Sequence, residues 1–114
     1  MVVKRGEIWW VSLPEPHGSE PGYRRPMLIV QADTFNGSAI KTVLCAVITS
    51  NMNLALAPGN VPITARSSGL PKPSVVNVSQ LVTVDRTLMT DRIKKLDPET
   101  MKQVDDGLRL VMNI

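Results

Sequence analysis

The chain is poor in cysteine, histidine and aromatic residues. Of its 114 residues, one is cysteine, one is histidine and 4% are aromatic. A single cysteine forms no disulfide within the chain and cannot build a zinc cluster of thiolates, so the fold must depend on its apolar core. Cys45 lies inside the apolar run at 43–48, which predicts a small buried hydrophobic side chain rather than a nucleophile.

Long hydrophobic runs are also missing. No segment approaches the apolar length that a membrane-spanning helix requires, and Lys4 and Arg5 precede any stretch of signal-peptide length. We therefore expect a cytoplasmic protein with no membrane contact. The chain has no internal repeat, low-complexity tract or linker, which predicts one domain over residues 1–114. A domain of this size buries a modest core, so dimerisation is expected.

Positive charge is in slight excess. The chain carries 13 lysine and arginine residues against 10 aspartate and glutamate residues, for a net charge of +3. This balance favours an anionic partner, of which nucleic acid is the commonest. Charge alone leaves open a basic domain that binds nothing charged.

Short apolar runs separated by turn residues predict a mainly β fold. The expected strands are 8–13, 26–32, 41–50 and 61–64, followed by 73–78 and 80–84 as two strands or as one bent strand. Turn-forming residues predict a turn-rich patch at 33–38 and loops at 51–60 and 65–72. The spacing of these turns predicts about five to seven strands, which is typical of a small β-barrel.

The last segment changes period from strand to helix. Asp97 is a good N-cap, Pro98 suits the first helical position, and Glu99 complements the helix dipole. Apolar residues then recur at helical spacing from Met101 to Met112. The sequence therefore predicts a small β-barrel with α additions and a C-terminal helix.

Charged side chains gather in the turn-forming segment 18–26, which leads directly into the apolar strand. Because glycine and proline fix the path of this segment, Glu20 and Arg25 can be held near each other. A carboxylate accepts a proton, and a guanidinium offers a fork of donors that matches phosphate oxygens. Small hydroxyl and amide groups at 49–51 follow the next apolar run. This combination suits chemistry on a phosphate.

Taken together, these residues resemble the MazF/PemK family of toxin endoribonucleases. The segments that carry the resemblance run in order over nearly the whole chain, at 4–9, 18–26, 28–31, 48–50, 79–81 and 95–97. The resemblance implies an SH3-like barrel of the type shared with CcdB, a homodimer, and metal-independent, sequence-specific cleavage of single-stranded RNA without a cofactor. It also implies an antitoxin partner whose acidic, disordered tail occupies the RNA groove, with DNA bound only through that antitoxin.

The resemblance also implies roles for individual residues. Glu20 would act as the base for the substrate's 2′-hydroxyl, Arg25 would stabilise charge on the phosphate, and Thr49 would hydrogen-bond the scissile phosphate. Attack by the 2′-hydroxyl leaves a 2′,3′-cyclic phosphate and a 5′-hydroxyl. The division of base and acid between Glu20 and Arg25 stays open, although a guanidinium is a poor acid. The further candidates for RNA contact are Ser19, Tyr23, Arg24, Ser50, Asn51 and Gln80.

Several alternatives stay open. Arg24 either pairs with phosphate or is simply solvated, and Tyr23 either stacks on a base or covers the loop. Pro21 and Tyr23 depart from the usual family pattern, which bears on loop geometry and base preference. A CcdB-like topoisomerase poison and a non-catalytic SH3-like RNA-binding module share the expected fold, but neither explains the combination of a carboxylate, an arginine and a threonine.

Overall fold

The structure is a computed structural model that describes residues 2–13 and 24–114. The described residues form a six-stranded antiparallel sheet with the order β4-β5-β3-β2-β1-β6. The strands are β1 (Glu7–Ser12), β2 (Arg24–Ile29), β3 (Thr42–Thr49), β4 (Val61–Ile63), β5 (Ser74–Asp85) and β6 (Met89–Lys95). The helices are α1 (Asp33–Asn36), α2 (Ala65–Ser68) and α3 (Pro98–Met112), with 3₁₀ helices η1 (Met52–Leu56) and η2 (Arg86–Leu88).

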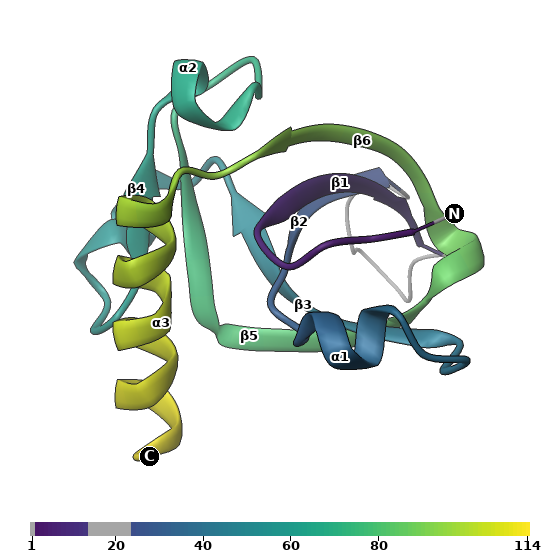
Figure 1. The fold of residues 1–114 in the computed structure, drawn as a ribbon. Helices are drawn as coiled ribbons and strands as arrows, with labels where there is room; N and C mark the ends of the chain where they lie inside the picture. The colour runs from purple at the N-terminus through teal and green to yellow at the C-terminus, as the bar shows by residue number, and fades with distance from the viewer. Residues whose placement is uncertain (1, 14–23) are drawn as a thin grey trace, which may run out of the picture.

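The sheet curls strongly, as Figure 1 shows. Strand β6 arcs over β1 and β2, while α3 stands beside β4 and the first part of β5. The edge strands of the sheet are β4 and β6. Helix α2, which follows β4, contacts β6, where the Lys94 Nζ donates a hydrogen bond to the Arg66 carbonyl oxygen at 2.7 Å. The expected fold, a small β-barrel with a C-terminal helix, is confirmed.

The long strand β5 bends where its pairing with β3 shifts register. Val47 pairs with Asn77, whereas the preceding residue Ala46 pairs with Leu81, so residues 78–80 form a bulge. A bulge bends its strand and increases the local twist. Figure 1 shows the two parts of β5 running in different directions. Strand β5 is therefore a single bent strand, one of the two forms that the sequence allowed.

Strand β6 was missed by the sequence analysis. It pairs with β1 alone, and most of its side chains are exposed. An edge strand with few buried positions and many charges lacks the alternation that identifies a half-buried strand. Two expected loops and the turn patch are also partly helical, because α2, η1 and α1 form within them. In α2 the Thr64 hydroxyl oxygen accepts a hydrogen bond from the Ser67 backbone N–H at 3.0 Å, which caps the helix.

The sheet buries apolar side chains on both faces, because alternate residues of a strand point to opposite sides. We call the cluster inside the curl the barrel core; it contains Val3, Trp9, Val11, Met27, Ile29, Val43, Cys45, Val47, Val84 and Met89. The cluster on the other face, the helix-side core, includes Ile8, Leu28, Ala46, Ile48, Val76, Val104 and Leu108. Burial raises the pKa of the Cys45 thiol to about 12, so this residue is a buried hydrophobic side chain, as predicted.

Helix α3 begins at the predicted cap and packs closely on the chain before β4. The Asp97 carboxylate accepts a hydrogen bond from the Thr100 backbone N–H at 2.7 Å. Further along, Gly107 lies against Gly59 so tightly that a Cβ at Gly107 would sit 2.1 Å from the Gly59 carbonyl oxygen. None of the helices in the described residues is long and apolar enough to cross a membrane.

Candidate active site

Three of the predicted site residues, Ser19, Glu20 and Tyr23, lie outside the described residues. The described chain resumes at Arg24, which begins β2. The structure therefore places the strand that follows these three residues, together with the strands on either side of it.

Arg25 and Thr49 lie at the same end of two neighbouring strands. The ladder between β2 and β3 pairs Met27 with Val47 at its last position. Arg25 and Thr49 each lie two residues beyond this last pair, so they are at the same end of the two strands. By the same alternation both residues share the face of Met27 and Val47, at the rim of the barrel core. Both are half-buried.

Thr49 and Asn51 shape the turn that follows β3. The Thr49 hydroxyl oxygen accepts a hydrogen bond from the Asn51 backbone N–H at 3.1 Å. The Asn51 side-chain oxygen in turn accepts from the Asn53 backbone N–H at 3.2 Å, which caps η1. Since a hydroxyl that accepts a bond can still donate one, Thr49 retains a proton that can be directed at a phosphate oxygen.

The bulge in β5 brings a third group of polar side chains to this face. Asn77 pairs with Val47, two residues from Thr49, and its side chain is buried. The Asn77 side-chain oxygen accepts from the Ser79 hydroxyl at 2.9 Å, and its amide donates to the Gln80 side-chain oxygen at 3.4 Å. Gln80, which the sequence analysis named, is thus held by Asn77 in the bulge that lies opposite Ala46 and Val47 of β3. Asn77 was missed, although a single amide within an apolar strand was a signal for it.

Arg24 points to the opposite face from Arg25, because neighbouring residues of a strand alternate. Its guanidinium forms an ion pair with Asp91 of β6 and lies 4.8 Å from the centroid of the Trp10 ring. Trp9 is buried in the barrel core while Trp10, on the other face of β1, is half-buried. Arg24 is therefore not simply solvated, because Asp91 and Trp10 hold its guanidinium.

Glu7 is the buried carboxylate of the described chain, and it lies at the far end of β1 from Arg25. Burial acts to raise its pKa, but hydrogen bonds from the Trp9 indole at 3.1 Å and the Lys4 backbone N–H at 2.8 Å, together with Arg92 at 2.6 Å, lower the pKa overall. A charge held so firmly is a structural anchor between β1 and β6. It does not suit a base that must take up a proton.

No group of three or more histidine, cysteine, aspartate or glutamate side chains that could hold a metal ion occurs within residues 2–13 and 24–114. The described part of the site thus offers a cation, a hydroxyl and amides on one face. This set suits binding and stabilising a phosphate.

Comparison with known proteins gives consistent matches over the whole chain. The family model described as PemK-like, MazF-like toxin of type II toxin-antitoxin system matches residues 4–112. Endoribonuclease MazF6 of Mycobacterium tuberculosis is 47% identical over 114 residues, covering 100% of both chains. Endoribonuclease EndoA of Bacillus subtilis is 37% identical over 110 residues, covering 96% of this chain and 94% of that protein.

A solved structure gives the same fold. It is described as an endoribonuclease in complex with its cognate antitoxin from Mycobacterial species, and it matches with a TM-score of 0.75 at 18% identity. The match covers 99% of this chain and 95% of that one.

Proposed function

Because the chain belongs to the PemK-like, MazF-like toxins of type II toxin–antitoxin systems, we propose that it is an endoribonuclease that cleaves single-stranded RNA at short sequences. The observation that carries this proposal is the full-length match at 47% identity to a protein named as an endoribonuclease. Messenger RNA in the cytoplasm is the proposed substrate.

The proposed reaction uses the substrate's own 2′-hydroxyl as nucleophile. Its oxygen attacks the neighbouring phosphorus while Glu20 takes its proton, and the bond from phosphorus to the 5′-oxygen breaks as that oxygen gains a proton. The products are a 2′,3′-cyclic phosphate and a 5′-hydroxyl. Arg25 stabilises the charge on the phosphorane, and Thr49 donates a hydrogen bond to one of its oxygens. No metal or cofactor takes part.

The shared face of Arg25 and Thr49 supports these roles. Arg25 is paired with Val11 of β1 and Thr49 with Val75 of β5, so the sheet holds the backbone of both residues at the ends of adjacent strands. The RNA on either side is bound by Ser19, Tyr23, Arg24, Ser50, Asn51 and Gln80. Asn77 joins this set as the residue that holds Gln80 in place.

An antitoxin with an acidic, disordered tail is the proposed partner. Such a tail binds along the RNA-binding surface, where its carboxylates replace phosphate charge, and it becomes ordered only on binding. The solved complex of a similarly folded endoribonuclease with its cognate antitoxin supports a partner of this kind. DNA is contacted only through the antitoxin.

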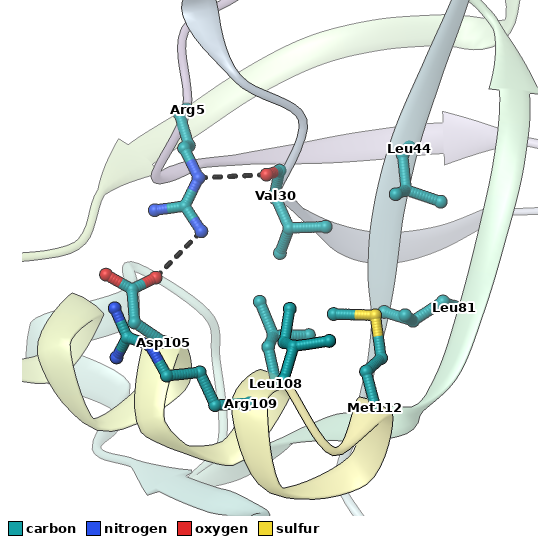
Figure 2. Close-up of a pocket in the computed structure, with 9 residues that line it drawn as sticks. Arg5, Val30, Leu44, Leu81, Asp105, Leu108, Arg109 and Met112 are labelled. Carbon is teal, nitrogen blue, oxygen red and sulfur yellow. Dashed lines mark hydrogen bonds and ion pairs between the residues drawn. The ribbon is translucent and has the colours of Figure 1, made fainter.

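A homodimer is the proposed assembly, and the end of α3 offers an apolar surface for it. Leu110, Val111, Met112 and Ile114 are exposed there. The adjoining pocket has a volume of about 300 Å³. Figure 2 shows Leu44, Leu81, Leu108 and Met112 lining it to one side of the ion pair of Arg5 with Asp105. Exposed apolar side chains beside an apolar pocket are typical of a protein–protein contact.

The test of the proposed activity is incubation of the purified protein with mixed-sequence single-stranded RNA in excess chelator. Discrete cuts that recur after one short sequence are expected. A CcdB-like topoisomerase poison would leave the RNA intact and inhibit the topoisomerase instead. A non-catalytic RNA-binding module would retard the RNA in a gel without cutting it, and either result would contradict the proposal.

A further inference from the structure

A second pocket, of about 180 Å³, opens at the same strand ends as Arg25 and Thr49 but on the other face of the sheet. One wall is formed by Trp10, Pro26 and Ile48, which come from three adjacent strands. Leu70 and Pro71, which follow α2, also line it. The pocket is therefore a slot between the curled sheet and the segment after α2.

This slot lies one residue away from the candidate active site on two strands. Pro26 follows Arg25 in β2, and Ser50, which also lines the slot, follows Thr49 at the end of β3. Consecutive Cα atoms are about 3.8 Å apart. A ligand that places a phosphate between Arg25 and Thr49 therefore has the mouth of the slot within reach of its adjoining groups.

The chemistry of the slot fits a flat, uncharged group that is attached to anions. Its walls are apolar, with the half-buried Trp10 indole on one side. Its polar groups include the Lys72 ammonium and the Ser50 hydroxyl, and no carboxylate is among the described residues that line it. The Arg24 guanidinium, which is paired with Asp91, lies 4.8 Å from the centroid of the Trp10 ring. Aromatic and apolar walls flanked by cations are how proteins hold single-stranded nucleic acid.

We propose that this slot holds one unpaired nucleobase of the RNA, next to the scissile phosphate, and so contributes to the choice of cleavage sequence. The proposal rests on the proposed endoribonuclease activity. The base is bound by the apolar walls, while Lys72 and Ser50 supply hydrogen bonds to its edge or to the adjoining phosphate.

The test uses two changes together. One is a protein variant whose larger side chain fills the slot, and the other is an RNA substrate that lacks one base. Ser50→Leu adds apolar bulk at the slot, and Thr34→Leu, which also replaces a hydroxyl side chain by leucine, is the control at an exposed position of α1. Oligonucleotides that span a mapped cleavage site carry an abasic residue at one position at a time around the cut. For each pair, kcat/KM is measured together with binding of a non-cleavable version by fluorescence anisotropy.

For the wild type and for Thr34→Leu, one abasic position near the cut should lower kcat/KM and affinity about tenfold, the scale of one stacked base. In Ser50→Leu the intact RNA should already show this loss, and the same abasic residue should cost less than a further twofold. If Ser50→Leu fails to fold, Lys72→Ala replaces it, with Lys102→Ala as the control. Lys72 is exposed, so its removal leaves the fold intact while reducing the penalty of the abasic residue.

Two results would overturn the proposal in distinguishable ways. In the first, the wild type cuts the intact RNA, but the reductions in kcat/KM caused by Ser50→Leu and by each abasic position multiply independently. The slot then holds no base, while the endoribonuclease activity stands. That result, combined with a weaker complex between Ser50→Leu and an acidic peptide, would assign the slot to a protein partner. If the wild type neither cuts nor binds the intact RNA, the proposed function and the slot assignment both fail.

Discussion

Arg24 and Arg25 are neighbours in sequence whose side chains serve different purposes. Arg24 joins β2 to β6 through Asp91 and packs on Trp10, whereas Arg25 shares a face with Thr49 at the rim of the barrel core. Of these two arginines, only Arg25 is proposed to act in catalysis.

Arg25→Ala should lower kcat by about 10²- to 10³-fold, the scale of removing one preorganised donor to a developing charge. RNA affinity should fall much less, because the other cations still contact phosphates. Lys102→Ala, which removes an exposed cation of α3 away from the site, is the control and should leave kcat unchanged. Single-turnover cleavage and anisotropy separate the two effects, and near wild-type turnover in Arg25→Ala would contradict the role.

Glu7 is the residue whose charge the fold itself requires. Its hydrogen bonds to Lys4, Trp9 and Arg92 hold its pKa below the ordinary value of 4.5. A carboxyl group whose pKa is lower in the folded state stabilises the fold above its unfolded-state pKa. That contribution is lost as the pH falls through the lower, folded-state pKa.

Glu7→Gln should therefore lower the free energy of unfolding at pH 7 by about 1–3 kcal/mol, the cost of weakening buried, charge-assisted hydrogen bonds. Its stability should also fall less steeply than that of the wild type below pH 4.5. Urea denaturation at several pH values measures both effects, with the exposed Glu99→Gln as the control. Parallel pH profiles for wild type and Glu7→Gln would show that Glu7 is not the anchor.

At the scale of elements, α3 packs against the chain before β4 through a close contact between two glycines. A glycine inside a helix normally costs about 0.5–1 kcal/mol relative to alanine, so replacing it usually stabilises. Here a Cβ on Gly107 would lie 2.1 Å from the Gly59 carbonyl oxygen, a backbone atom that cannot move aside alone.

Gly107→Ala should consequently destabilise the protein by about 1–3 kcal/mol, the range of an overpacked core. Lys102→Ala, at an exposed position of the same helix, should be close to neutral. Thermal and urea denaturation compare the two. A Gly107→Ala variant more stable than the wild type would mean that α3 sits further from Gly59 than the structure has it.

Elements with a strong local signal could be predicted from the sequence. Strand β3 was identified from its uninterrupted apolar run at 43–48, which suits a strand buried on both faces. Helix α3 was identified because a capping residue precedes apolar residues at helical spacing. Strand β6 could not be predicted from the sequence. It forms by long-range pairing with β1, and its mostly polar residues give no local strand signal. The bend of β5 was left open because a bulge depends on register with β3.

The candidate site was predictable only in part, for the same reason. The end of β3 marked Thr49, and the charged segment before β2 marked Arg25. Their shared face follows from the register of β2 on β3. Asn77 depends on a register shift between distant segments, and the slot lined by Trp10 and Leu70 depends on the curl of the sheet. A lone amide within an apolar strand marks Asn77 itself, but no local pattern shows which side chains it meets or that the slot forms.

For the whole molecule, the exposed apolar end of α3 predicts the dimer contact. Met112→Glu places a charge on this surface and should shift the protein from dimer to monomer in sedimentation velocity at micromolar concentration, with its circular dichroism unchanged. Leu56→Glu is the control, because Leu56 is 91% exposed on η1, and it should leave the dimer intact. A wild type that sediments as a monomer, or a Met112→Glu variant that stays dimeric, would contradict this interface.

The central claim is that the molecule cuts RNA by directing the substrate's own 2′-hydroxyl at the phosphate between Arg25 and Thr49. It is tested most directly with two oligonucleotides that differ only in the 2′-hydroxyl at a mapped cut, each incubated with the protein in EDTA. The account predicts that the all-RNA strand is cut to a 2′,3′-cyclic phosphate and a 5′-hydroxyl, while the strand with the single 2′-deoxy substitution stays intact. Cleavage of the 2′-deoxy strand at the same position, or activity that EDTA abolishes and a divalent ion restores, would contradict it.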